Sequence, residues 1–193
     1  MSSHHFVKEG QEPALFILGP VVLSDINPLL EWSPLVIVHE TVLEEALRWG
    51  IKIDVVVTEK DTGELMEQLD AQGPVKILIP EKSVLETVIQ FLRSIRQSAV
   101  AIAVQEESTI LDDAQFFADE LLITVIAASV KWSLIRTGVF TKWLPEKTLL
   151  SFHGITGVLM VNEHAWQDHS FLTPSPGVVH VQHQGPFWIG EPV

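Results

Sequence analysis

Carboxylate side chains follow several aliphatic runs of the sequence, at positions where they could bind a metal ion. Glu59 and Asp61 come just after one such run, Glu40 ends another, and Asp112 lies near the start of a helical pattern. Open α/β sheets bind ligands beyond the carboxyl ends of their strands, and Mg²⁺ takes one or two carboxylates together with phosphate oxygens. The pattern therefore favours a Mg²⁺–nucleotide site. Acidic residues also stabilise helix N-termini without any ligand, so the sequence leaves that structural explanation open.

Other kinds of site find little support in the sequence. The chain has no cysteine, which excludes disulfides, thiolate metal sites and a cysteine nucleophile. It contains neither a G-x-G-x-x-G loop nor a GKS or GKT loop, the common glycine-rich phosphate sites. His180 and His183 are three residues apart. On a regular strand their side chains point to opposite faces, so they would share one metal ion only if a bulge interrupted the strand.

Five aliphatic runs predict buried strands. Their Val, Ile and Leu residues are continuous rather than alternating, as in strands covered on both faces of a parallel sheet. The runs are 14–19, 35–40, 53–58, 75–80 and 99–104. Helical patterns at 41–49, 83–97 and 109–122 each open with a capping pair, namely Thr41 with Glu44, Ser83 with Glu86, and Thr109 with Asp112. This alternation predicts right-handed βαβ units and an open sheet.

The character of the sequence changes near residue 124. Later segments are short, rich in β-branched and aromatic residues, and separated by Gly and Pro, which is typical of antiparallel strands. We therefore predict two domains. Residues 1–123 form an α/β domain with an open, mostly parallel sheet and flanking helices, and residues 124–193 form a small antiparallel, sandwich-like β domain.

The predicted β domain is small enough to be marginal as a separate core. It carries four tryptophans, a residue type enriched at protein interfaces, at positions 132, 143, 166 and 188. We therefore expect a homodimer that uses this region. The alternative is that the tryptophans fill the domain's own core.

The overall composition argues against some classes of binding partner. The chain has 193 residues, 47% of them hydrophobic, and a net charge of -13. That charge argues against nucleic acid and against anionic membrane surfaces. The N-terminus shows no signal-peptide pattern, and the longest apolar stretches are too short and too interrupted to span a bilayer. We expect a soluble, cytoplasmic protein.

Two stretches carry a resemblance to the thiamine pyrophosphokinase family, whose members transfer pyrophosphate from ATP to thiamine with Mg²⁺. The family reads D-G-G-A-N and later G-I-x-P-D, where this chain reads "ETVLEEALRWGIKID" with Glu40 and Asp54 at acidic positions. The family then reads G-D-F-D-S, where this chain reads "TEKDT" with Glu59, Asp61 and Thr62.

Two later stretches extend the resemblance. The family's T-D-x-E is similar to "SVLE", which keeps Glu86, and its G-G-R-x-D-H is similar to "STILDD", which keeps Asp112 but has Ile110 and Asp113 at the Arg and His positions. In the family, an α/β catalytic domain precedes a β-sandwich and the protein is a homodimer.

The resemblance implies a role for each matching residue. Glu59 and Asp61 would hold Mg²⁺, and Asp61 and Asp112 would serve catalysis. The nucleotide-binding positions would be Glu40, Asp54, Thr62 and Glu86. The ligands would be ATP and a thiamine-like molecule. We expect the five acids at positions 40, 54, 59, 61 and 112 to converge on one cleft at the carboxyl ends of the strands.

Several features that the family uses to bind phosphate are absent here. Its glycines, which let the backbone approach phosphates closely, are replaced at Thr41, Val42, Thr58, Ser108 and Thr109. The missing Arg removes a bidentate phosphate partner. We therefore expect pyrophosphate transfer to be weak or lost. The alternatives are a non-catalytic homodimer that binds a nucleotide or another ligand, and a structural or interaction protein.

Overall fold

The computed structural model describes residues 12–59 and 62–193, which fall into two compact units. The first unit comprises the chain up to Gln105 together with Phe117–Ile123, and the second comprises Glu106–Phe116 and Thr124–Val193. The chain therefore enters the second unit after residue 105, returns to the first unit after residue 116, and enters the second unit again after residue 123.

The first unit contains a parallel sheet of five strands in the order β5-β1-β2-β3-β4. The strands are β1 (Ala14–Ile17), β2 (Val36–His39), β3 (Val55–Val57), β4 (Lys76–Leu78) and β5 (Ala99–Val104). All residues of β1 and β3 are buried, as expected when both faces of a parallel sheet are covered. The predicted α/β class is confirmed.

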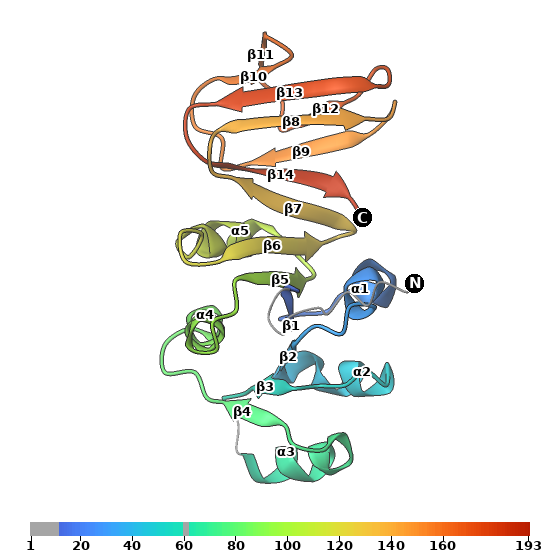
Figure 1. The fold of residues 1–193 in the computed structure, drawn as a ribbon, viewed down its shortest axis with the longest axis vertical. Coiled ribbons are helices and arrows are strands. Elements are labelled where there is room, and N and C mark those ends of the chain that lie inside the picture. Colours follow the sequence, from blue (N-terminus) through green and yellow to red (C-terminus); the bar gives the residue numbers. More distant parts are fainter. Residues whose placement is uncertain (1–11, 60–61) are drawn as a thin grey trace, which may run out of the picture. The chain divides into compact units, whose positions relative to one another are not determined.

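Helices cover the two faces of this sheet. In Figure 1, α1 (Leu23–Leu30) and α2 (Leu43–Arg48) lie on one side of β1 and β2, and α4 (Val84–Ser94) lies on the other. A further helix, α3 (Thr62–Leu69), connects β3 to β4, and short 3₁₀ turns occur at η1 (Glu40–Val42) and η2 (Asp70–Gln72). Helix α1, which contains Pro28, was not among the predicted helices.

Only one of the three predicted helix caps forms. The Ser83 hydroxyl accepts a hydrogen bond of 3.1 Å from the Glu86 backbone N–H at the start of α4. The Thr41 cap is wrong, because that hydroxyl bonds the His39 ring at 2.8 Å while Val42 caps α2 without its side chain. The Thr109 cap is also wrong, since α5 (Ser108–Gln115) begins earlier and ends seven residues before the predicted end at 122.

The second unit is built from α5 and antiparallel strands in two sheets. The sheet orders are β12-β9-β14-β7-β6 and β11-β10-β13-β8. The strands are β6 (Leu122–Ala127), β7 (Val130–Ile135), β8 (Val139–Leu144), β9 (Leu149–His153), β10 (Leu159–Val161), β11 (His164–Trp166), β12 (Ser170–Leu172), β13 (Gly177–His183) and β14 (Phe187–Pro192). Strand β6 begins in the first unit, where the Leu122 N–H donates to Ser98 O.

The two sheets of the second unit share one apolar core. Phe152, Phe187 and Ile189 from one sheet pack with Val179 and Val181 from the other. Burial alternates along β13, which is the pattern of a sandwich with one face inward. The prediction that His180 and His183 face opposite sides is confirmed, because His183 is buried and His180 lies on the outer face.

The tryptophans of this unit do not share one environment. Trp132 and Trp188 are buried, at 5% and 0% exposed, and neither belongs to the core that the two sheets share. Trp166 packs edge-to-face on Phe171 with ring centroids 5.2 Å apart. Only Trp143 is strongly exposed, at 61%. Among the described residues, no helix is long and apolar enough to cross a membrane.

Candidate functional site

The carboxylate of Glu40 joins the carboxyl ends of two neighbouring strands. Glu40 follows β2, and its Oε2 accepts hydrogen bonds from the Thr58 hydroxyl and, at 3.2 Å, from the Glu59 backbone N–H, both just after β3. Thr58 is only 1% exposed. Glu40 itself is only partly buried, and donors of this kind replace the water that its carboxylate has lost. The acid at the strand end is thus held by the protein's own groups.

Of the two predicted metal ligands, Glu59 is described by the structure and lies at this same edge of the sheet. Glu59 is exposed and follows β3. Asp61 lies outside the described residues, and Thr62 is the first residue of α3. No group of three or more His, Asp or Glu side chains in the described part of the chain is arranged to hold a metal ion. The assignment of Glu59 and Asp61 to Mg²⁺ therefore stays a prediction.

Glu86 lies beside a small pocket that follows the carboxyl end of β4. The pocket has a volume of about 230 Å³ and is lined by Ile79, Glu81, Lys82, Glu86, Thr87 and Gln90. The Glu86 carboxylate pairs with Lys82 at 3.1 Å and accepts a hydrogen bond from Gln90 Nε2 at 3.1 Å. Its neighbours are therefore side chains of its own helix region, as in an ordinary first-turn acid.

Asp54 lies at the opposite end of the strands, so its predicted place in the carboxyl-end cluster is wrong. Its Oδ2 accepts a 3.0 Å hydrogen bond from the Val36 N–H at the start of β2, and its Oδ1 pairs with Lys52 at 2.7 Å. The reason is strand direction: Asp54 precedes β3, whereas Glu59 follows it. The hydrogen bond and charge of Asp54 raise the pKa of Lys52.

Asp112 belongs to the second unit, on α5, where it forms a pair that the sequence did not reveal. His153 Nε2 on β9 lies 2.8 Å from Asp112 Oδ1, so the ring donates its N–H to the carboxylate. The side chain of His153 is 29% exposed and that of Asp112 is 67% exposed. The family pattern places a His directly after this Asp. Here Asp113 holds that position, and the imidazole comes from 41 residues along the chain.

Three solved structures of thiamine pyrophosphokinases are similar to this fold. The enzyme from Bacillus subtilis matches with a TM-score of 0.62 and 10% identity, covering 93% of this chain and 99% of its own. The one from Candida albicans has a TM-score of 0.64 and 9% identity, with 94% and 90% coverage. The yeast enzyme has a TM-score of 0.67 and 6% identity, with 94% and 86% coverage.

Sequence comparison adds nothing to this likeness. No protein-family model matches the chain, and no curated protein matches it. At such low identity the likeness concerns the fold and not the activity. Over almost its whole length, then, this chain has the fold of the thiamine pyrophosphokinases.

Proposed function

We propose that this protein is a thiamine pyrophosphokinase-related ligand-binding protein in which pyrophosphate transfer from ATP is weak or lost. One observation carries the proposal. Thr58 stands where the family resemblance has glycine, and its buried hydroxyl donates to the carboxylate of Glu40. The Glu40 carboxylate, which the family resemblance assigns to nucleotide binding, instead links two strands.

The side chain of Thr58 also removes space at this edge. A glycine there would leave room for a phosphate to approach the backbone, whereas a β-branched side chain fills that room. Phosphoryl-type transfer depends on positioning and on stabilising the charge of the transferred group. Loss of one such electrostatic group costs roughly 10²–10³ in rate, and one is missing here, because Ile110 stands at the position of the family's Arg.

The negative charge at the carboxyl ends of β2 to β4 also supports weak or lost pyrophosphate transfer. Among the described side chains, four carboxylates lie there, those of Glu40, Glu59, Glu81 and Glu86. The one described cation among them, Lys82, is paired with Glu86. Such an edge disfavours ATP unless Mg²⁺ offsets the charge, and it suits a divalent cation or a thiamine-like cation. Glu59 with Asp61 remains our choice for the Mg²⁺ ligands.

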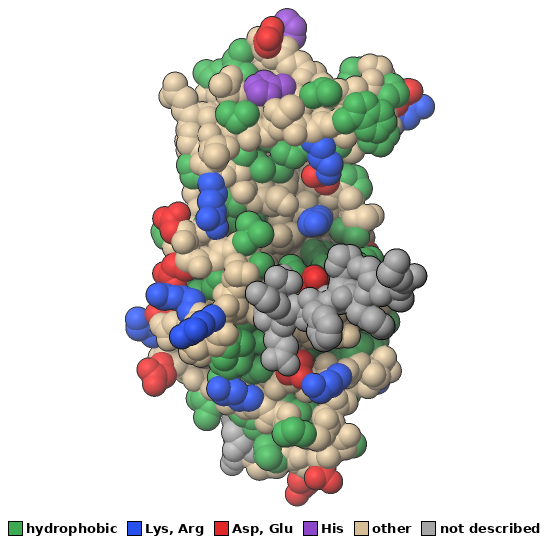
Figure 2. Space-filling model, viewed as in Figure 1, with side chains coloured by type: hydrophobic (Ala, Val, Ile, Leu, Met, Phe, Trp, Pro, Cys, Tyr) green, Lys and Arg blue, Asp and Glu red, His purple; other side chains and the backbone are tan. Residues whose placement is uncertain are grey.

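A homodimer is part of the proposal. The outer face of β8 and β13 exposes Val139, Trp143 and Val178 at 42%, 61% and 61%, and hydrophobic side chains gather on this part of the molecule in Figure 2. Trp143 and Val178 are direct cross-strand partners. On the same face, Thr141 and His180 lie between this pair and Val139 and are hydrogen-bonded at 2.7 Å. Exposed apolar side chains that include a Trp are typical of protein interfaces. Light scattering at micromolar concentration tests this, and a monomeric mass would count against it.

A ligand screen by thermal unfolding tests the binding function, because a ligand of the folded state raises its stability. We expect ADP or ATP with Mg²⁺, or thiamine, to raise the unfolding temperature. For the nucleotide the effect should disappear in the double variant Glu59→Ala, Asp61→Ala. The matched control is Glu67→Ala, Asp70→Ala, which removes the same charge from exposed positions away from the predicted ligands.

Turnover is measured on the same proteins as ATP-dependent conversion of thiamine to its diphosphate. We expect no efficient conversion. Robust turnover that the Glu59, Asp61 double variant abolishes would overturn the proposed loss of activity. Neither turnover nor binding would overturn the binding function and leave the acids with structural roles.

A further inference from the structure

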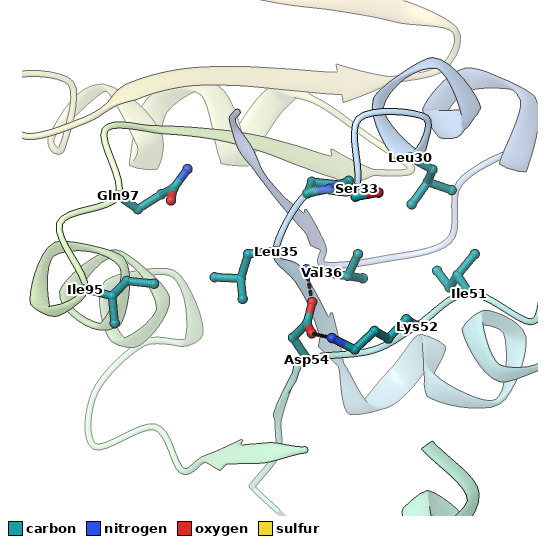
Figure 3. Close-up of a pocket in the computed structure, with 10 residues that line it drawn as sticks. Leu30, Ser33, Leu35, Val36, Ile51, Lys52, Asp54, Ile95 and Gln97 are labelled. Atoms are coloured by element: carbon teal, nitrogen blue, oxygen red, sulfur yellow. Dashed lines mark hydrogen bonds and ion pairs between the residues drawn. The ribbon is translucent and has the colours of Figure 1, made fainter. Parts of the chain in front are cut away.

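A larger cavity lies at the amino ends of the strands, away from the carboxyl-end acids. Its volume is about 780 Å³, and its lining comes from the loops before β2, β3 and β5 (Figure 3). The lining includes Leu30, Leu35, Ile51, Lys52, Ile95 and Gln97. All belong to the first unit. This volume is within the range of small-molecule sites.

One wall of the cavity presents a hydrogen-bond acceptor, the side-chain oxygen of Gln97. Gln97 is only 8% exposed. Its Nε2 donates to the backbone oxygens of Glu12 and Ala99, and its backbone N–H donates to Leu92 O. These bonds fix the amide so that its oxygen has no partner among the described residues, and Figure 3 shows the amide directed into the cavity. Oε1 is not among the buried unpaired side-chain atoms of the described residues, so it is open to the cavity, where it can accept a hydrogen bond from a ligand donor.

The opposite wall presents a cation. Lys52 Nζ pairs with Asp54 Oδ1 at 2.7 Å, and Asp54 Oδ2 is taken by the Val36 N–H. The carboxylate is thus engaged through both oxygens. The ammonium has three donors, so two remain for a ligand at the rim. The raised pKa of Lys52 keeps this group protonated.

Apolar side chains connect the two polar ends. Figure 3 shows Leu35 and Ile95 near the Gln97 end and Leu30 and Ile51 near the Lys52 end. Ile95 is 46% exposed. An apolar chain lying across these residues would remove that surface from water.

We propose that this cavity binds a small amphipathic carboxylic acid that carries a hydrogen-bond donor at the end away from its carboxylate. The carboxylate meets the Lys52 ammonium at the rim, the apolar chain lies on Leu35 and Ile51, and the distal donor meets Gln97 Oε1. The ligand would carry a donor at one end of an apolar chain and an anion at the other. The cavity offers the matching groups, the acceptor Gln97 Oε1 and the Lys52 ammonium, at the two ends of an apolar surface. The site is independent of the proposed function, which concerns the other ends of the strands.

Three short probes separate the parts of this proposal. They are 6-hydroxyhexanoate, which has both end groups, hexanoate, which lacks the distal donor, and 1,6-hexanediol, which lacks the charge. Binding to the full chain is followed by backbone amide shifts in nitrogen-15 NMR. We expect saturable shifts at Gln97, Ile95 and Ile51 at millimolar concentration. Loss of the distal donor should weaken binding about fivefold. Loss of the charge should weaken it by about threefold at low salt and by less at high salt.

Two variants test the site from its two ends. Ile95→Trp fills the cavity from an exposed position and should abolish the shifts. Lys52→Met removes the ammonium and should make hexanoate bind no better than 1,6-hexanediol, while Lys52→Arg restores the difference. The matched control is Lys82→Met, since the side chains of Lys52 and Lys82 are 77% and 74% exposed, and it should change nothing.

Several results would overturn the proposal. These are no saturable shift in the wild-type protein with any probe, shifts confined to the apolar face around Trp143, or equal binding of all three probes. The wild-type measurements decide these outcomes even where a variant does not fold. Binding unchanged in folded Ile95→Trp would also reject the cavity as the site.

Discussion

The two ends of strands β2 and β3 use a carboxylate in the same way and differ in what surrounds it. At the carboxyl end, Glu40 after β2 accepts from Thr58 and Glu59 after β3. At the amino end, Asp54 before β3 accepts from Val36 at the start of β2. Each acid therefore links the same two strands. A buried threonine fills the space beside Glu40, whereas an open cavity of about 780 Å³ lies beside Asp54.

This difference shows that an acid at a strand end is not by itself a ligand site. Short parallel strands leave backbone N–H groups at their ends without a ladder partner, and a buried one is costly. A carboxylate that accepts such a group stabilises the sheet whether or not a ligand binds. What makes one end a better candidate for binding small molecules is the space and the unused polar groups around the acid.

The largest effect is expected from removing the acid at the amino end. Asp54→Ala leaves the Val36 N–H without its acceptor and removes a charge-assisted bond, so the free energy of unfolding should fall by about 3 kcal/mol. Asp54→Asn keeps an acceptor for Val36 and should cost clearly less. Urea unfolding of both variants measures the difference. Equal losses would show that the charge, rather than the acceptor, links the strands.

The next largest effect is expected at the carboxyl end. Thr58→Val keeps the shape of the buried side chain but removes the hydroxyl that donates to Glu40. The free energy of unfolding should fall by about 2 kcal/mol, the scale of a hydrogen bond to a charged group. Thr58→Ser retains the donor and serves as the control. A double-mutant cycle with Glu40→Ala isolates the pair, and a coupling near zero would contradict the proposed link.

A smaller effect is expected for the more exposed pair in the second unit. Asp112 and His153 are hydrogen-bonded at 2.8 Å, yet the Asp112 side chain is 67% exposed. Asp112→Asn should therefore lower the free energy of unfolding by less than about 1 kcal/mol. If Asp112→Asn lowered the free energy of unfolding as much as Thr58→Val does, the difference in burial between the two hydrogen-bonded pairs would not explain their contributions to stability.

The smallest effect concerns Lys52, whose ammonium is exposed at the rim of the amino-end cavity. Its pKa is raised in the folded state by the hydrogen bond and charge of Asp54. A raised pKa means that the stabilisation is complete below the unfolded-state pKa and is lost as the pH rises through the folded-state pKa. Stability of the wild type should therefore fall slightly more than that of Lys52→Met in alkaline solution. Parallel urea unfolding curves from neutral to alkaline pH measure this, and identical pH profiles would contradict the link to Asp54.

The strands were the most predictable part of the fold. All five aliphatic runs of the first unit became parallel strands, because continuous Val, Ile and Leu residues favour strands buried on both faces. Helix α1 was missed because Asn27 and Pro28 interrupt its apolar pattern. The third helix was predicted too long, since apolar residues after Gln115 continue the pattern although the helix ends there.

The candidate site was less predictable than the strands. Glu40 and Glu59 lie at the carboxyl ends of β2 and β3, but Asp54 lies at the other end, because the resemblance follows the order of residues and not the direction of the strand. His153 left no signal in the sequence. It is 41 residues from Asp112, and no local spacing indicates such a pair.

The sequence by itself determined the alternation of buried strands and helices and the change to an antiparallel β region, since these depend on periodicities of a few residues. Only the tertiary structure decided the partner of each acid. Glu40 and Thr58 are 18 residues apart, as are Val36 and Asp54. Whether a carboxylate over such a separation meets a donor, a cation or an open cavity depends on strand order and packing, which bring distant residues together only after the sheet has formed.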